Sequence, residues 1–187
     1  GILHLSGISQ AISASAGAAS LAAMEVAREA GVRVSYDPNL RLALWPLEEA
    51  RPAILDALAR ADVALPGLED ARTLTGLQEP REIVQAVRQM GPGVVALTLG
   101  PEGVLLAGPE GVAEVPGLAV RAVDATGAGD CFDGAFLGRL AAGDEPVRAA
   151  RYAAVAASLS TTGYGAVAPI PRAAQVAAAL DEADGSG

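Results

Sequence analysis

The chain has 187 residues with a formal net charge of −9, and 51% of the residues are hydrophobic. This composition suffices for one domain with a sizeable core and argues against disorder. The acidic balance argues against a nucleic-acid partner, which would need a basic stripe on the protein surface. Every basic residue is an arginine, and there is one cysteine and one histidine. An intramolecular disulfide, a Cys/His zinc site and a lysine Schiff base are therefore excluded.

No segment predicts an export signal or a membrane span. Residues 1–24 carry no formal charge but lack the basic start of a signal peptide. Residues 152–171 are also uncharged, but glycine and proline interrupt them. We therefore expect a cytoplasmic protein without a membrane partner.

Short apolar runs alternate with helical patterns over the first 99 residues. Strands are expected at 2–5, 32–36, 63–65 and 94–99, and helices at 14–30, 48–60, 69–74 and 81–90. This alternation predicts an α/β fold, with a doubly wound, mainly parallel sheet flanked by helices.

The pattern changes after residue 99, where Gly-Pro-Glu-Gly occurs at 100–103 and again at 108–111. Proline in the second position and glycine in the fourth favour tight turns, so the apolar runs around them predict an antiparallel strand pair. Further helices are expected at 128–142, 145–160 and 172–180. No linker divides the sequence, and we expect a single domain over residues 1–187.

The most informative stretch is Asp124-Ala125-Thr126-Gly127-Ala128-Gly129-Asp130. Its small residues let the backbone approach a ligand closely, and the helix that begins there offers free N–H groups to an anion. An anion beside the Asp130 carboxylate suits phosphoryl transfer to a hydroxyl, with Asp130 as the base. The alternative is an ordinary glycine-rich turn before a helix, which leaves the crowding of carboxylates around one turn without an explanation.

Residues 124–130 resemble the second signature of the ribokinase-like (PfkB) carbohydrate kinases, written D-T-x-G-A-G-D. Ala125 and Thr126 stand where the family often has two hydroxyl residues. The resemblance implies that Asp130 is the catalytic base and that the amides of Gly127, Ala128 and Gly129 form an anion hole. It also implies ATP as the phosphate donor, bound in part by Thr126, and Mg²⁺ between the ATP phosphates.

A second group of polar residues follows the strand expected at 32–36. Ligands of doubly wound sheets gather at the carboxyl ends of strands, so Asp37, Asn39 and Arg41 are placed to bind a substrate. Arg41 could hold a carboxylate in a bidentate pair. The alternative is an Asp-Pro-Asn turn with Arg41 in a structural salt bridge.

Residues 37–45 resemble the D-P-N-x-R-x-x-L-W motif of 2-keto-3-deoxygluconate kinases and of some fructokinases, and residues 5–9 resemble the former branch. The resemblance implies that Arg41 binds the carboxylate of a sugar acid. The expected activity is ATP-dependent phosphorylation of a terminal hydroxyl of 2-keto-3-deoxygluconate. Two alternatives stay open: a fructokinase or another sugar or nucleoside kinase, and a non-catalytic sugar- or nucleotide-binding module.

Two further features resemble the family less closely. Thr98, Gly100 and Gly103 occupy its nucleotide-side turn, which implies contact with ATP, although a plain hairpin turn explains them equally well. Residues 66–70 align with its N-x-x-E metal and phosphate motif, but glycine replaces the asparagine and Asp70 replaces the glutamate. Asp70 and Asp124 are therefore the expected outer-shell partners of a metal ion.

The resemblance runs from about residue 5 to about residue 180 and lacks the family's first signature, its lid and its first strands. We therefore expect a fragment of the domain that is inactive alone, and a homo-oligomer when the protein is full length.

Overall fold

A computed structural model describes residues 1–185 of the chain. The strands form a six-stranded sheet in the order β1-β2-β3-β4-β5-β6. The chain divides into two compact units, residues 1–98 with 105–112, and residues 99–104 with the chain from 113 onward. Each unit is described separately, and the expectation of one domain stays a prediction.

The sheet begins with four parallel strands. These are β1 (Ile2–Ser6), β2 (Arg33–Asp37), β3 (Val63–Ala64) and β4 (Val94–Thr98). The middle of β2 and of β4 is fully buried, because parallel strands inside an α/β sheet are covered on both faces. The parallel sheet expected from the sequence is confirmed.

The last two strands, β5 (Val104–Gly108) and β6 (Gly111–Val115), form a hairpin. The residues between them and the few residues between β4 and β5 are too few for a parallel crossover, so both connections join antiparallel neighbours. The repeated Gly-Pro-Glu-Gly stretches lie at these two turns. The sheet is therefore mixed but mostly parallel.

Five helices belong to the first unit. They are α1 (Gly7–Ala11), α2 (Ala14–Glu29), α3 (Leu47–Arg60), α4 (Leu68–Thr75) and α5 (Pro80–Met90). Helix α5 buries Ile83, Val84 and Val87 on one stripe, as its helical period requires. The sequence did not predict α1, because five residues are too short for a helical period to be recognised.

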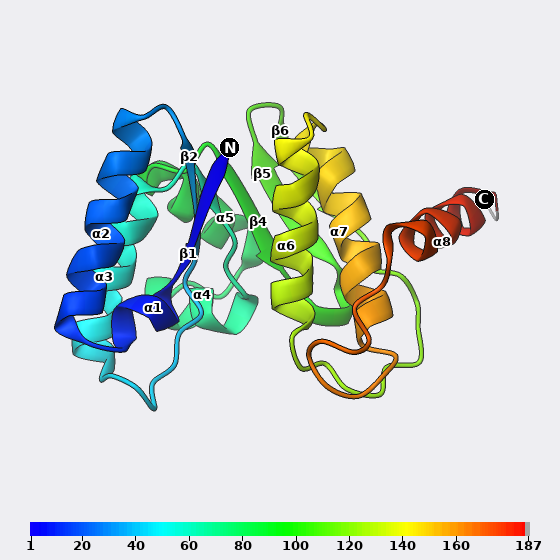
Figure 1. Cartoon of the computed structure of the whole chain (residues 1–187), viewed down its shortest axis with the longest axis horizontal. Helices are drawn as coiled ribbons and strands as arrows, with labels where there is room; N and C mark the ends of the chain where they lie inside the picture. The colour runs from blue at the N-terminus through cyan, green and yellow to red at the C-terminus, as the bar shows by residue number, and fades with distance from the viewer. Residues whose placement is uncertain (186–187) are drawn as a thin grey trace. The chain divides into compact units, whose positions relative to one another are not determined.

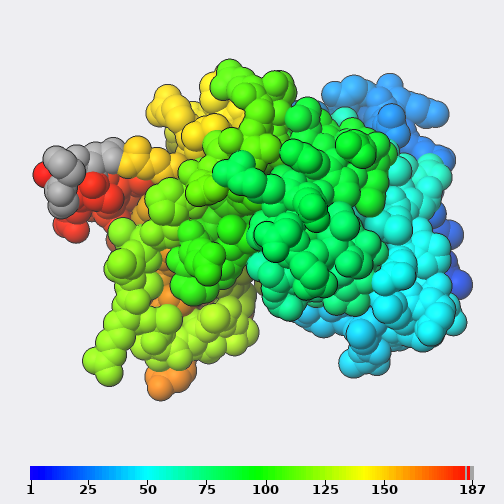
Figure 2. Space-filling model, turned by 180° about the vertical axis from the view of Figure 1, so that it is seen from behind, coloured from blue at the N-terminus to red at the C-terminus, as the bar shows by residue number. Residues whose placement is uncertain are grey.

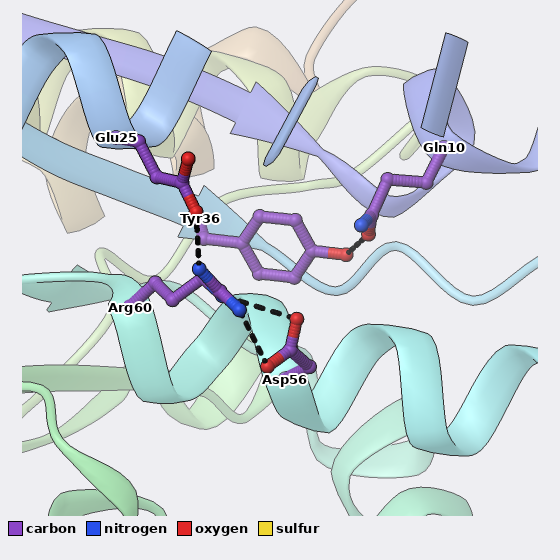
Figure 3. Close-up of polar contacts among 5 residues, drawn as sticks. All are labelled: Gln10, Glu25, Tyr36, Asp56 and Arg60. Atoms are coloured by element: carbon purple, nitrogen blue, oxygen red, sulfur yellow. Dashed lines mark hydrogen bonds and ion pairs between the residues drawn. The ribbon is translucent and has the colours of Figure 1, made fainter. Parts of the chain in front are cut away.

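Helices α2 and α3 run alongside each other in the first unit (Figure 1). Arg60 of α3 joins them, since its guanidinium lies 2.9 Å from Glu25 of α2 and 3.0 Å from Asp56 one turn earlier in α3 (Figure 3). These groups are solvent-exposed or partly exposed, so the pairs contribute little to stability.

The second unit is built on α6 (Ala128–Ala141), α7 (Pro146–Ser160) and α8 (Ala173–Gly185). Helices α6 and α7 lie side by side (Figure 1). Phe132 and Phe136 stack in α6 with ring centroids 5.6 Å apart, while α7 buries a row of alanines. Val176 anchors α8 in a cluster with Cys131 and Val155. None of the helices within residues 1–185 combines the length and apolarity that crossing a membrane demands.

Candidate active site

In the first unit, the carboxyl ends of β2, β3 and β4 lie at one edge of the sheet. The N–H of Leu65 donates to the carbonyl of Tyr36 at 3.0 Å, and the N–H of Thr98 donates to the carbonyl of Pro66 at 3.0 Å. Because the strands are parallel, their carboxyl ends share this edge. It is the place where doubly wound sheets bind ligands.

The loop after β2 brings the three predicted substrate residues together in a fixed turn. Asp37 Oδ1 accepts a hydrogen bond from the N–H of Asn39 at 3.0 Å. Asn39 has φ +33°, a conformation that Asn tolerates better than most residues and that often occurs at functional sites. The side chain of Arg41 is exposed and donates only to the Leu40 carbonyl, at 3.3 Å. No carboxylate in residues 1–185 forms an ion pair with Arg41, so the structural salt bridge is absent from this part of the chain.

Residues that the sequence did not single out pack against this turn. Tyr36 is fully buried, and its Oη donates to Oε1 of Gln10 in α1 (Figure 3). Burial raises the pKa of Tyr36, and the charge of Asp37 raises it further, so the phenol stays a donor. A Cβ on Gly7 would lie 2.0 Å from the carbonyl oxygen of Pro38, so only glycine fits against the turn. In the sequence, the one sign of this packing is Gly7, a glycine that directly follows β1.

In the second unit, Asp124 organises the loop that precedes α6. Its Oδ1 accepts hydrogen bonds from the N–H of Thr126 at 2.9 Å and from the Thr126 hydroxyl at 2.7 Å. Its Oδ2 accepts from the N–H of Gly165 at 2.9 Å. These bonds, the one from the Thr126 hydroxyl foremost, lower the pKa of Asp124 to about 2. Figure 1 shows the two connected loops, in yellow-green and orange, at one end of α6 and α7, and the same colours lie next to each other in Figure 2.

Gly127 is the residue at which this loop becomes a helix. It has the left-handed φ of +76° and ends the loop at the start of α6. A Cβ there would lie 2.7 Å from the Cβ of Ala166, so Gly127 is required by both conformation and packing. Part of the glycine pattern is therefore structural.

The first turn of α6 offers a base next to uncapped amides. No side chain caps this helix end, and a Cβ on Gly129 would meet no atom within 4 Å. The Ala128 N–H donates to the carbonyl of Ala125 at 3.1 Å, whereas the N–H groups of Gly127 and Gly129 have no acceptor in residues 1–185. Asp130 is exposed, and its carboxylate has no partner in the same residues. The turn can bind an anion beside a free carboxylate.

The glycines in the turn between β4 and β5 are explained by the backbone conformation of the turn itself. Gly100 and Gly103 have φ of +63° and +104°, and the N–H of Gly103 donates to the carbonyl of Gly100 at 3.1 Å. A Cβ on Gly103 would lie 2.1 Å from the carbonyl oxygen of Val115. The hairpin turn is thus present, and contact of Thr98, Gly100 and Gly103 with ATP stays a prediction.

The two carboxylates expected to serve a metal ion are both engaged by N–H groups. Asp70 Oδ2 accepts from the N–H of Leu40 at 2.8 Å, and both oxygens of Asp124 are engaged as described. Residues 1–185 contain no group of three or more His, Cys, Asp or Glu side chains that could hold a metal ion. Magnesium in phosphate-transfer sites needs few protein ligands, since phosphates and water supply the rest. The residues therefore fit a metal held mainly by a nucleotide, and the roles of Asp70 and Asp124 in it stay predictions.

Comparison with known proteins points to one family. Residues 1–173 match the pfkB family carbohydrate kinase. The chain is 36% identical to Fructokinase-1 of Zea mays over 174 residues, covering 88% of this chain and 54% of that protein. It is 35% identical to 2-dehydro-3-deoxygluconokinase of Thermoproteus tenax over 177 residues, covering 92% of this chain and 53% of that protein.

The fold comparison gives the same result. The structure of a fructokinase from Vibrio cholerae O395, in a form with fructose, ADP and calcium ion bound, superposes with a TM-score of 0.89 at 33% identity. The match covers 96% of this chain and 60% of that one. The chain spans about half the length of the relatives from Zea mays and Thermoproteus tenax. The ribokinase-like fold expected from the sequence is confirmed, and the chain belongs to the pfkB family of carbohydrate kinases.

Proposed function

We propose that the natural full-length protein is an ATP-dependent kinase that phosphorylates a terminal hydroxyl of a sugar acid, 2-keto-3-deoxygluconate. The observation that carries the proposal is the free carboxylate of Asp130 in the first turn of α6, beside amides that no side chain caps. A helix end of this kind attracts phosphate, and an unpaired carboxylate can accept a proton.

In this mechanism Asp130 accepts the proton of the sugar hydroxyl as that oxygen attacks phosphorus. ATP would supply the phosphoryl group, and the bond between its γ-phosphorus and the bridging oxygen would break as ADP leaves. A divalent ion held mainly by the nucleotide would spread the charge on the phosphates. The N–H groups of Gly127 and Gly129 bind the negative oxygens of the transferred group. Ala128 can join them only by giving up its bond to the carbonyl of Ala125.

Arg41 supports the choice of a sugar acid. Its guanidinium is exposed at the ligand edge of the sheet, and none of the described carboxylates forms an ion pair with it. It is therefore available to a substrate carboxylate, while Asp37 and Asn39 offer hydrogen-bond partners to sugar hydroxyls.

Fructose is the second candidate substrate. The similarity to fructokinases from Zea mays and Vibrio cholerae supports it as strongly as the Thermoproteus tenax relative supports the sugar acid. With fructose, Arg41 would donate to neutral hydroxyls. Magnesium as the natural ion, a cytoplasmic location and assembly into homo-oligomers belong to the same proposal.

The test is ADP release by the full-length protein with magnesium-ATP, comparing 2-keto-3-deoxygluconate with fructose. A preference of ten-fold or more in kcat/KM for the sugar acid is the expected result. A preference for fructose would leave Asp130 as the proposed base and make fructose the substrate in place of the sugar acid. Binding of sugar and nucleotide without ADP release would identify a non-catalytic module and overturn the kinase proposal.

A further inference from the structure

Asp70 lies in the first turn of α4, yet its carboxylate does not cap that helix. Helix α4 has no side-chain cap at its start, although a carboxylate in the first turn is well placed to provide one. Instead Asp70 Oδ2 accepts a hydrogen bond from the N–H of Leu40, 30 residues earlier, at 2.8 Å. The side chain therefore connects α4 to the loop that follows β2.

Leu40 is a buried residue of that loop. It lies between Asn39, with its φ of +33°, and the exposed Arg41, and the residue is only 7% exposed. The Leu40 N–H and carbonyl are both engaged, the N–H by Asp70 and the carbonyl by Arg41. A bond to this N–H fixes the peptide plane between Asn39 and Leu40, and so restrains the backbone that leads directly into Arg41.

The charge of Arg41 also acts on Asp70. Partial burial raises the pKa of Asp70, whereas the Leu40 N–H and the nearby positive charge of Arg41 act in the opposite direction. The contact thus joins the half-buried Asp70 carboxylate to the loop that follows β2.

We propose that Asp70 is a positioning residue for the sugar substrate, because its bond to the Leu40 N–H sets the direction in which Arg41 meets the substrate. This inference rests on the proposed function, since it needs Arg41 to contact the sugar. It assigns Asp70 to the loop that follows β2 and not to a metal ion.

The experiment compares Asp70→Ala and Asp70→Asn in the full-length protein, with Glu69→Gln as the matched control. Glu69 is an exposed neighbour in the same helical turn and pairs with Arg72. In D70N the amide oxygen of the new side chain can still accept from the Leu40 N–H, whereas the methyl group of D70A cannot. The measurements are hydrogen exchange of the Leu40 amide, KM for the sugar, KM for magnesium-ATP and the dependence of rate on Mg²⁺ concentration.

The positioning role predicts that D70A raises sugar KM about ten-fold or more and accelerates exchange at Leu40. KM for magnesium-ATP and the Mg²⁺ dependence stay within two-fold of the wild type. D70N restores sugar KM and Leu40 protection to within about three-fold, and E69Q changes none of the four quantities.

Two results would overturn the inference while leaving the proposed function intact. One is a D70A protein with active turnover, unchanged sugar KM and unchanged Leu40 protection. The other is a shifted Mg²⁺ dependence in D70N, which would assign Asp70 to the metal. If D70A does not fold, D70N alone decides between these roles. A wild-type protein that neither binds nor phosphorylates a sugar would overturn the proposed function, and the Asp70 inference with it.

Discussion

Asp124 joins the loop before α6 to the loop after α7, because its Oδ2 accepts a hydrogen bond from the N–H of Gly165 at 2.9 Å. Gly127 packs against Ala166 directly beyond this bond. The start of α6, which carries Asp130, is therefore held by residues that lie about 40 positions later in the sequence.

Replacing Asp130 with asparagine should lower kcat on the order of 10²–10⁴-fold, because asparagine cannot accept the hydroxyl proton. The fold should be unaffected, since the carboxylate has no partner in residues 1–185. Steady-state ADP release and circular dichroism measure the two effects. Asp181→Asn, an exposed carboxylate change on α8, is the matched control and should leave kcat unchanged. A near-normal kcat in D130N would refute the role of base.

Gly127 and Gly129 should respond differently to alanine. Gly127→Ala adds a Cβ at a φ of +76° and 2.7 Å from Ala166, so it should cost about 1–3 kcal/mol of unfolding free energy. Gly129→Ala adds a Cβ in open space at a helical position, so stability should rise by up to about 1 kcal/mol. Its kcat/KM should nevertheless fall, because the added methyl group would meet a bound phosphate. Denaturant unfolding and ADP release separate the two effects, and unchanged activity in G129A would argue against an anion hole there.

Asp124 should make stability depend on pH in the acid range. Its pKa is about 2 in the folded protein, below its ordinary value near 3.9, so its contribution is present above that value and is lost as pH falls toward 2. Asp124→Asn should therefore lose less stability than the wild type between pH 5 and pH 2. Thermal unfolding of both proteins across this range measures the difference. Parallel curves would show that the carboxylate charge contributes nothing.

The buried hydrogen bond between Tyr36 and Gln10 should contribute measurably to the free energy of unfolding, although Gln10 lies in a short helix. Tyr36→Phe leaves the Gln10 amide buried without its donor and should cost about 1–3 kcal/mol. Adding Gln10→Leu removes the unsatisfied group and should recover part of that loss. A double-mutant cycle by denaturant unfolding gives the coupling energy. Additive effects of the two changes would contradict the prediction.

Arg41 should decide between acidic and neutral sugars. Arg41→Ala should raise KM for 2-keto-3-deoxygluconate about ten-fold or more and leave KM for magnesium-ATP nearly unchanged, because the loss is confined to a carboxylate contact. Arg41→Lys should have a KM for the sugar acid between those of the wild type and of Arg41→Ala, since lysine keeps the charge but cannot form the bidentate pair. Arg148→Ala, an exposed change on α7, is the control. Equal increases in KM for fructose and for the sugar acid would show that Arg41 does not bind the carboxylate.

The order of strands and helices could be predicted from the sequence, because apolar periodicity is a local property. The fold class was recognised from the same pattern and from one short motif around Asp130, in which glycines, a helix start and a carboxylate occur together. Helix α1 escaped prediction because five residues carry no period, and Gln10 because a polar residue gives no sign that it will be buried.

What the sequence determined by itself is the chemistry available to this protein: a carboxylate beside small residues, an arginine after a strand, and no lysine. The tertiary structure decided what each carboxylate does. Asp70, Asp124 and Asp130 look alike in the sequence, yet the first binds the Leu40 amide, the second links two loops, and Asp130 is left free. Hydrogen-bond partners distant in the chain set these roles, and no local pattern encodes such partners.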